Sequence, residues 1–414
     1  MHTMHNDLQS SYERAPVSET TRALLCVFAA ADPRRPLPRL KADWDQVFRG
    51  IARNGLVGPS FDYLNRQAET DYPPPEFQQR IQQAHRTLTI RLAQLYKNIG
   101  RVITGLANHG INFLIVKGPA LAYTVYRDPS LRFFNDLDLL VRERDWSAIY
   151  HALLDMGFRQ PENLPQPPPK LVPYLSAYES KYWHSKTGFL VEVHYEDLYN
   201  TGLVSRDIDG FWKRAIGIEV DGLPVRVPSL EDQLVHECMH AHYHGYTRLN
   251  WFSDLALIVR DHADRLDWER VIETVRLEQL HAGVYYTLYF LDRLLGVPAP
   301  AEALDAVRPD GFRRWWHERV LPERKVLSMQ PMSRPVFSFY FIPLLNRLIP
   351  DWLVMGRRKE KLRCLLHLLF PPRAWLRYYY RLPDTPMVML HYFLHPLKLA
   401  SHYLVEITQA LVRS

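Results

Sequence analysis

The stretch FLIVKGPALAYTVYRDPSLRFFNDLDLLV, residues 113–141, decides the fold class. It opens with apolar and β-branched residues typical of a short buried strand, and Pro119 then stands where the first turn of a helix favours proline. After a loop, residues 136–141 alternate acidic and apolar side chains, as a second strand does. The stretch therefore predicts strand, helix and strand in succession.

The flanking segments are predicted to be amphipathic helices. Residues 76–110 repeat apolar side chains at spacings of three and four and end at Gly110, a residue that favours helix C-termini. Residues 143–158 show the same period and end near Gly157. Helices alternating with strands predict an α+β core, with a small mixed sheet and flanking helices.

Two β-hairpins are expected after this core segment. Strand-like runs in residues 181–198 are separated by Thr187 and Gly188, and residues 217–229 hold an Asp-Gly pair at their middle. The first hairpin contains the run VEVHYEDL, which adds acidic residues to the sheet. We therefore expect its strand to extend the sheet of residues 113–141.

Four units are expected along the chain. Ser229, with Asp232 three residues later, has the pattern of a helix start, and the helical period continues to about Leu295. The expected units are an N-terminal helical unit at 1–75, an α/β core at 76–228, a helical domain completing the cleft at 229–300, and a basic, aromatic-rich helical tail at 301–414.

The positive charge is concentrated in the tail. The net charge of +6 divides into +9 for residues 301–414 and −3 for residues 1–300. The tail is also rich in leucine and aromatic residues, which favours amphipathic helices with basic side chains around a packed apolar face. Contact with a peripheral membrane surface or another protein is the alternative.

The composition excludes several classes of protein. Hydrophobic residues make up 47% and charged residues 23%, so disordered and collagen-like chains are excluded. The 3 cysteines are far apart and support no disulfide framework or CxxC site. The N-terminus has no apolar signal segment, and the chain holds no apolar run of about 20 residues. We expect no transmembrane segment and a cytoplasmic location.

Two pairs of polar residues indicate a metal site. Asp136 and Asp138 are two apart on a predicted strand, so both carboxylates point to one face and need a cation, for which Mg²⁺ is suited. Glu192 and His194 are spaced in the same way, and antiparallel pairing of the two strands is expected to supply Glu192 as a third carboxylate.

A phosphate site is expected beside these carboxylates. Lys117 and Gly118 stand where the first strand turns into a helix, and glycine there lets the backbone approach an anion. Arg132 lies in the loop that leads to the acidic strand. The order of lysine-glycine, arginine, acidic pair and acidic strand favours a combined metal and phosphate site.

Residues 113–141, the helix ending in MGF, the run VEVHYEDL and the stretch SLEDQLVHECMHAHYHGYTRLNWFSDLALIV together resemble an uncharacterised bacterial nucleotidyltransferase family. The family is a branch of the polymerase-β-like superfamily, and the resemblance covers roughly residues 76–297, with LFPPRAWLRYYY in the tail also similar. It implies a polymerase-β-like core between helical units. Some members are encoded near lasso-peptide and other peptide-modification genes.

The resemblance implies Mg²⁺-dependent transfer of a nucleoside monophosphate from an NTP, by default ATP, to a hydroxyl acceptor. Asp136, Asp138 and Glu192 would hold two metal ions, and Lys117, Gly118 and Arg132 would bind the phosphates. The acceptor would be a small molecule, a peptide or a protein, and nucleic acid is not favoured. Lasso-peptide biosynthesis is one setting that the resemblance suggests.

Two departures from the superfamily pattern bear on activity. A Gly-Ser pair usually precedes the acidic pair, whereas Lys117 and Gly118 stand here at a longer distance from it. Glu192 stands where aspartate is usual. A non-catalytic nucleotide- or peptide-binding accessory protein with the same fold is therefore an alternative.

The run His236-Glu237-Cys238-Met239-His240 offers a different enzyme. It fits H-E-x-x-H, which can bind Zn²⁺ through two histidines with the glutamate as general base, and His244 lies one turn further on. A zinc metallopeptidase is thus a second alternative. The family resemblance instead implies that this stretch lines the cleft or joins the helical unit to the core, through His240, Arg248, Trp251 and Asp254. His194 is a further candidate for lining the cleft.

Overall fold

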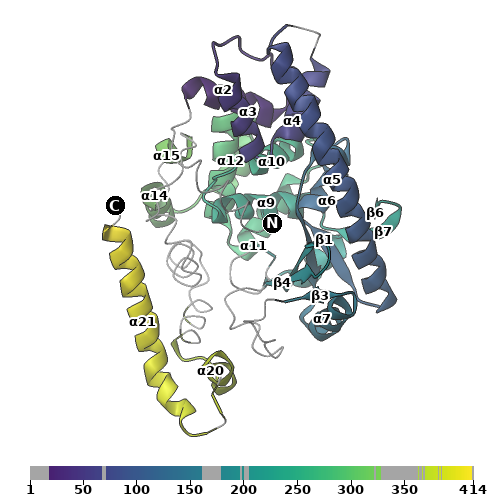
Figure 1. The fold of residues 1–414 in the computed structure, drawn as a ribbon. Helices are drawn as coiled ribbons and strands as arrows, with labels where there is room; N and C mark the ends of the chain where they lie inside the picture. The colour runs from purple at the N-terminus through teal and green to yellow at the C-terminus, as the bar shows by residue number, and fades with distance from the viewer. Residues whose placement is uncertain are drawn as a thin grey trace.

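A small mixed sheet with helices around it forms the centre of the molecule (Figure 1), which confirms the predicted α+β class. The computed structural model describes residues 18–67, 71–160, 179–195, 198–199, 205–320, 323–327, 362, 366, 369–380, 382–383 and 385–412. Within these residues the main sheet has five strands in the order β1-β2-β5-β4-β3. The strands are β1 (Phe113–Val116), β2 (Asp136–Val141), β3 (Phe158–Arg159), β4 (Glu179–His184) and β5 (Leu190–Tyr195).

The direction of β5 differs from the prediction. β5 runs parallel to β2, with Asp138 opposite Glu192, so the expected antiparallel pairing is wrong. The chain crosses from β2 to β5 through α7 (Trp146–Asp155), β3 and β4, and such a connection is long enough to bring a strand back in the same direction. β1 pairs with β2, and β4 with β5, in the antiparallel sense.

One face of the sheet is packed into an apolar core. Leu137 and Leu139 of β2 and Val191 and Val193 of β5 are fully buried in a core. That core also contains side chains of α7 and of the long helix α5 (Pro75–Asn108). Because side chains alternate along a strand, the residues between them, Asp138 and Glu192 among them, point to the opposite face. The apolar pattern therefore fixes which face carries the acidic groups.

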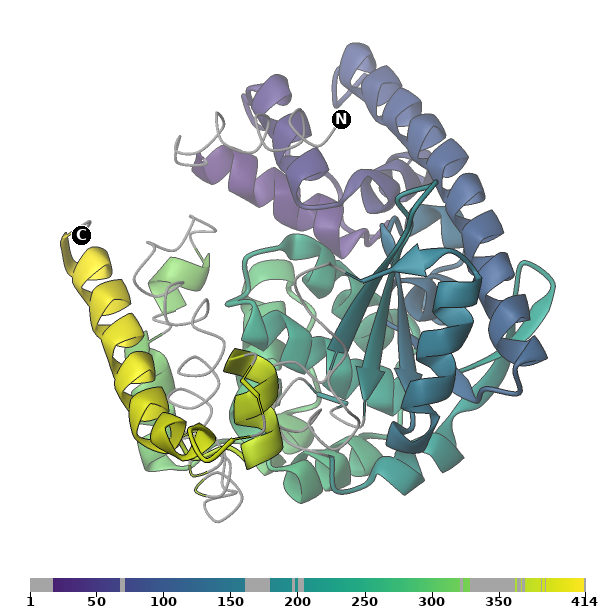
Figure 2. The same cartoon turned by 60° about the horizontal axis from the view of Figure 1, so that its bottom comes forward.

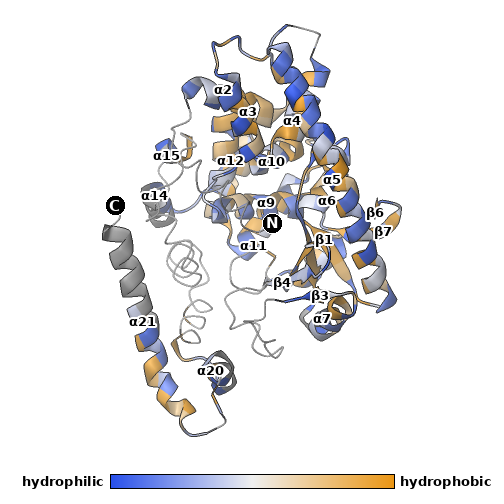
Figure 3. Cartoon of the chain, in the orientation of Figure 1, coloured by the Kyte–Doolittle hydropathy of each residue, from blue (hydrophilic) through white to orange (hydrophobic). Residues whose placement is uncertain are grey.

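The helices on the opposite side share a second core with the N-terminal helices. Leu24 and Phe28 of α2 (Glu19–Ala30) belong to one buried cluster with Leu234, Phe252 and Leu291, which come from α9, α10 and α12 respectively. Figure 2 shows the strands between α5 and the helices that form this second core, and Figure 3 shows the apolar residues on their inner faces. The bounds are α3 (Trp44–Arg53), α4 (Val57–Arg66), α9 (Leu230–Tyr243), α10 (Leu249–Asp261), α11 (Trp268–Glu278) and α12 (His281–Leu295).

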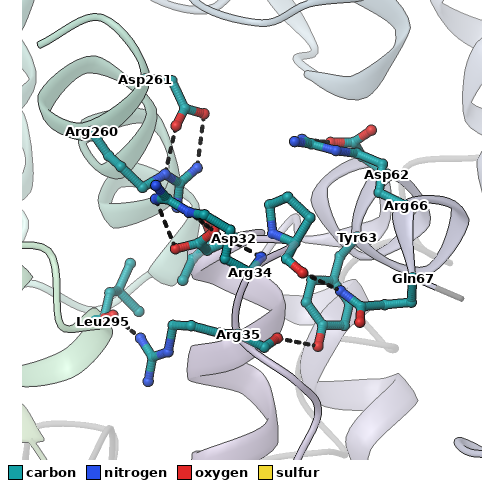
Figure 4. Close-up of polar contacts among 12 residues, drawn as sticks. Asp32, Arg34, Arg35, Asp62, Tyr63, Arg66, Gln67, Arg260, Asp261 and Leu295 are labelled. Atoms are coloured by element: carbon teal, nitrogen blue, oxygen red, sulfur yellow. Dashed lines mark hydrogen bonds and ion pairs between the residues drawn. The ribbon is translucent and has the colours of Figure 1, made fainter.

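Polar contacts attach the segment after α2 to α10 and α12 (Figure 4). The Arg260 guanidinium donates to the carbonyl of Ala30 at 2.6 Å, and Arg35 donates to the carbonyl of Leu295. The Tyr63 hydroxyl from α4 donates to the carbonyl of Arg35 at 2.7 Å. Residues distant in sequence are thus joined through backbone carbonyls that would otherwise lack partners.

Several turns form as predicted. Asp221 and Gly222, both at positive φ (50° and 77°), join β6 (Ile216–Val220) to β7 (Leu223–Val227) in a tight hairpin. Ser229 caps α9 by accepting a hydrogen bond from the backbone N–H of Asp232 at 3.2 Å. The remaining short elements are α6 (Gly118–Thr124), α8 (Ile208–Arg214), η1 (Pro129–Leu131) and η2 (Glu143–Asp145).

The C-terminal tail is described only in part. Its helices are α13 (Ala301–Ala306), α14 (Gly311–Val320), α15 (Glu323–Leu327), α20 (Arg373–Tyr380) and α21 (Val388–Val412). The last two contact each other, and Tyr380 and His395 share a hydrogen bond of 2.7 Å. The predicted helices of residues 328–361 lie outside the described residues. Among the residues that are described, no helix has the length and hydropathy needed to cross a bilayer.

Close packing fixes α4 against the segment before β2. A Cβ placed on Gly58 would lie 1.8 Å from the carbonyl oxygen of Leu131, the last residue of η1. A backbone atom cannot rotate away as a flexible side chain can. Gly58 therefore sets the distance between the N-terminal helices and the loop that leads into the acidic strand.

We expect Gly58→Ala to lower the free energy of unfolding by about 1–3 kcal/mol or more, because the added methyl group overpacks this contact. Chemical denaturation followed by circular dichroism measures the change. Gly217→Ala in β6 is the control, since a Cβ there meets nothing within 4 Å. Equal stability of the two variants would contradict the proposed close contact.

Candidate active site

Lys117 is held in an unusual backbone conformation between β1 and α6. Its φ of 55° and ψ of −129° lie in a region that residues with a side chain rarely adopt, at a cost of order 1–3 kcal/mol. The following Gly118 is buried, and a Cβ on it would lie 2.7 Å from Cβ of Phe134. The sharp turn and the close packing direct the Lys117 side chain toward β2.

The Lys117 ammonium and the His194 imidazole meet at Asp138. Lys117 Nζ lies 2.6 Å and His194 Nε2 lies 2.7 Å from the same oxygen, Asp138 Oδ1. The two nitrogens are 3.3 Å apart. Burial acts to raise the pKa of Asp138, but the Lys117 and His194 groups outweigh it and hold that pKa well below its usual range. Asp138 is therefore a buried carboxylate anion.

Glu192 lies beside Asp138 on the neighbouring strand. The parallel register places the two residues directly opposite each other, and Lys181 of β4 stands opposite Glu192 on its other side. Lys181 Nζ contacts Glu192 Oε1 at 2.5 Å. One ligand atom from each of Asp138, Glu192 and His194 lies within 4.8 Å of the others, which is close enough for one metal ion to reach all three.

Asp136 begins β2 on the same face and is partly exposed. Burial, followed by repulsion from Asp138 and Glu192, raises the pKa of Asp136 to about 6. Three carboxylates therefore project from the same face of β2 and β5, with Lys117 and Lys181 beside them. A divalent cation would relieve this repulsion, so the residues fit a metal centre.

Arg132 is engaged in a buried ion pair. Its guanidinium donates to both carboxylate oxygens of Asp254 at 2.7 and 2.8 Å, and the Tyr126 hydroxyl donates to the same carboxylate at 2.6 Å. Asp254 is fully buried. Burial favours a lower pKa for Arg132, but the Asp254 carboxylate raises that pKa above its usual value. The pair joins the loop before β2 to α10.

The histidines of α9 lie close to the acidic centre. His236 is 8% exposed, and its Nε2 atom has no hydrogen-bond partner in the part of the chain that the structure describes. Burial, followed by the charges of Lys117 and His194, lowers the pKa of His236 to about 3. His240 packs edge-on against Trp251, with ring centroids 5.2 Å apart.

The geometry of α9 does not support the zinc-peptidase alternative. The rings of His236 and His240 are 6.5 Å apart and stacked. Within the described ranges neither ring belongs to a group of three ligands that one metal could reach. Burial, followed by the charge of Asp254, raises the pKa of Glu237 to about 8. The charges that act on this glutamate include those of the Arg132–Asp254 ion pair.

The structure brings together most of the residues singled out in the sequence. Gly118 adjoins the centre, whereas Arg248 is exposed at the start of α10. Lys181 was missed, although the Thr187-Gly188 turn fixes a hairpin register in which Lys181 stands opposite Glu192. The residues that meet in one region are Lys117, Asp138, Glu192 and His194, whereas Asp136 begins β2 and does not belong to the group of ligand atoms within 4.8 Å of one another.

Carboxylates on neighbouring strands of a small mixed sheet, with lysine ammonium groups beside them, suit an enzyme that transfers a phosphorus-containing group with the help of a bound metal. The chain belongs to the family described as uncharacterised nucleotidyltransferase, whose family model matches residues 41–296. No curated protein and no solved structure matches the chain. The matched range includes every residue of the acidic centre and both α9 and α10.

We expect Arg132→Met to lower the free energy of unfolding by about 3–5 kcal/mol, because Asp254 is left as a buried, uncompensated charge. Denaturant titration measures the loss. Arg270→Met is the control: it removes a pair with Glu273 at 2.5 Å whose side chains are 42% and 65% exposed, and it should cost less than about 1 kcal/mol. Similar losses of unfolding free energy in both variants would show that the buried pair stabilises the fold no more than the exposed pair does.

Proposed function

We propose that this nucleotidyltransferase moves a nucleoside monophosphate from an NTP to a hydroxyl group, with a divalent metal held by Asp136, Asp138 and Glu192. The observation that carries the proposal is the parallel register, which sets Asp138 directly opposite Glu192 in a buried site. Carboxylate oxygens suit a divalent cation, and ATP is the default nucleotide.

The reaction forms a bond from the acceptor oxygen to the α-phosphorus and breaks the bond to pyrophosphate. Bound metal would stabilise charge on the attacking and leaving oxygens. Asp136, Asp138 and Glu192 would hold that metal, and one of these carboxylates would take the proton of the acceptor hydroxyl. The buried position of Asp138 and Glu192 limits access of water to the reacting atoms.

Lys117 and Lys181 are the residues that we assign to the phosphates. Each ammonium already lies on a carboxylate of the centre, at 2.6 Å and 2.5 Å respectively. A metal on those carboxylates would compete with both ammonium groups, and phosphate oxygens bound to that metal would lie within their reach. The Arg132 guanidinium is committed to Asp254, so we assign Arg132 a positioning role in place of the phosphate role expected for it.

The proposal does not restrict the acceptor to one class of molecule. A small molecule, a peptide or a protein hydroxyl fits the same chemistry, and peptide natural-product biosynthesis is one setting. Cys26 and Cys238 are free thiols, which agrees with a cytoplasmic location. We do not favour nucleic acid, because the acidic centre lies in the part of the chain with a net negative charge.

We expect Asp138→Asn to reduce nucleotidyl transfer at least about a hundredfold, since loss of metal-based charge stabilisation costs several kcal/mol in the transition state. α-Labelled NTPs are incubated with divalent metal and a panel of hydroxyl acceptors, the chain itself included, and labelled product and pyrophosphate are measured. Asp155→Asn, at an exposed position ending α7, is the control.

Two results would contradict the transferase proposal. The first is full activity of Asp138→Asn. The second is saturable NTP binding by the wild type without pyrophosphate release under any condition, which indicates a non-catalytic binding protein with this fold.

We expect Lys181→Met to weaken NTP binding by about ten- to a hundredfold, because a hydrogen bond to a charged phosphate contributes about 1.5–3 kcal/mol. Calorimetric titration with a non-hydrolysable ATP analogue measures the affinity. Lys186→Met, on the exposed turn of the same hairpin, should leave the affinity unchanged. Unchanged affinity in Lys181→Met would remove Lys181 from the phosphate site.

A further inference from the structure

The acidic centre contains an imidazole as well as carboxylates. Three possible ligand atoms lie within 4.8 Å of one another: one oxygen of Asp138, one oxygen of Glu192 and one nitrogen of His194. Among the described residues, this is the group of three that could hold a metal ion. All three side chains are buried. The centre therefore offers two oxygen ligands and one nitrogen ligand.

The mixed ligand set bears on the choice of metal. Mg²⁺ takes oxygen ligands in near-ideal octahedral geometry and keeps several waters. Imidazole nitrogen suits first-row transition metals, whose affinity for such sites rises along the series from Mn²⁺. A buried imidazole among two carboxylates therefore favours a transition-metal dication over Mg²⁺.

The fold holds the His194 nitrogen in place. His194 is 6% exposed and lies on β5, two residues after Glu192 and thus on the same face. Its Nε2 atom is 2.7 Å from Asp138 Oδ1, so a metal bound to that oxygen lies within reach of the ring. The β2–β5 register therefore fixes the spacing of both ligands.

A second, independent observation comes from α9. His236 is more than nine-tenths buried, and its Nε2 has no partner among the residues that the structure describes. The ring is close enough to respond to the charges of Lys117, His194 and Asp138, and it has a hydrogen bond with the backbone of Leu198. A second imidazole nitrogen thus lies beside the centre, and no group among the described residues satisfies it.

Lys117 competes for the same position. Its ammonium contacts both Asp138 and His194, at 2.6 and 3.3 Å. A dication carries twice the charge and is attracted by Asp136 and Glu192 as well, so it can replace the ammonium at Asp138 Oδ1. Lys181, which contacts Glu192 at 2.5 Å, is a second cation beside the ligands.

We propose that Asp138, Glu192 and His194 form a centre selective for a divalent first-row transition metal such as Mn²⁺ or Zn²⁺ over Mg²⁺, with His194 Nε2 as a direct ligand and His236 beside it. This inference deepens the proposed function by naming the class of metal. In this proposal His194 binds the metal directly. A purely structural histidine would only donate a hydrogen bond to Asp138.

The test measures binding of the metals alone to the full chain. Titration calorimetry should show that Mn²⁺ and Zn²⁺ bind about tenfold or more tightly than Mg²⁺. Electron spin echo spectroscopy of bound Mn²⁺ should show nitrogen coupling from an imidazole. In His194→Gln the coupling should disappear and Mn²⁺ affinity should fall about tenfold, whereas Mg²⁺ affinity should change little.

His184→Gln is the matched control, because His184 lies on neighbouring β4 and contacts Thr187 at the turn instead of the centre. The wild-type coupling decides the question even if His194→Gln does not fold. Equal affinities without nitrogen coupling would overturn the proposal, and the transferase would still stand if Mg²⁺ supports labelled product. Absence of any metal binding would overturn the proposal, and absence of product with every metal would overturn the transferase separately.

Discussion

The parallel pairing of β2 with β5 is the constraint on which the rest of the site depends. It sets Asp138 opposite Glu192, and the alternation of side chains then puts Asp136 and His194 on the same face. A shift of one residue in this register would turn the carboxylates into the apolar core. Burial of Leu137, Leu139, Val191 and Val193 opposes such a shift, so the hydrophobic effect fixes the polar centre.

The two hydrophobic cores hold the centre from opposite sides. One packs α5 and α7 on the apolar face of the sheet, and the other joins the N-terminal helices to α9, α10 and α12. The Arg132–Asp254 pair links these parts, because it ties the loop before β2 to α10. The site therefore lies between the sheet and a helical layer, and the strained backbone of Lys117 persists because the surrounding structure fixes it.

Much of the local structure was predictable from the sequence. Apolar periods, the Asp221-Gly222 turn and the Ser229 cap depend on residues close in sequence, and they were predicted correctly. The direction of β5 was predicted wrongly, because it depends on the path of the whole connection from β2 to β5. The ion pair between Arg132 and Asp254 was also not predicted. Asp254 lies 122 residues away in the sequence, and nothing local indicates that the two side chains meet.

The central claim is that Asp138 and Glu192 bind one metal ion at the reacting phosphates. Anomalous diffraction from crystals soaked with Mn²⁺ and a non-hydrolysable NTP analogue tests it most directly. The account predicts an anomalous peak about 2.0–2.6 Å from an oxygen of each carboxylate, with a phosphate oxygen as a further ligand. A metal bound only elsewhere, such as at the α9 histidines, or a nucleotide bound away from β2 and β5, would contradict the account.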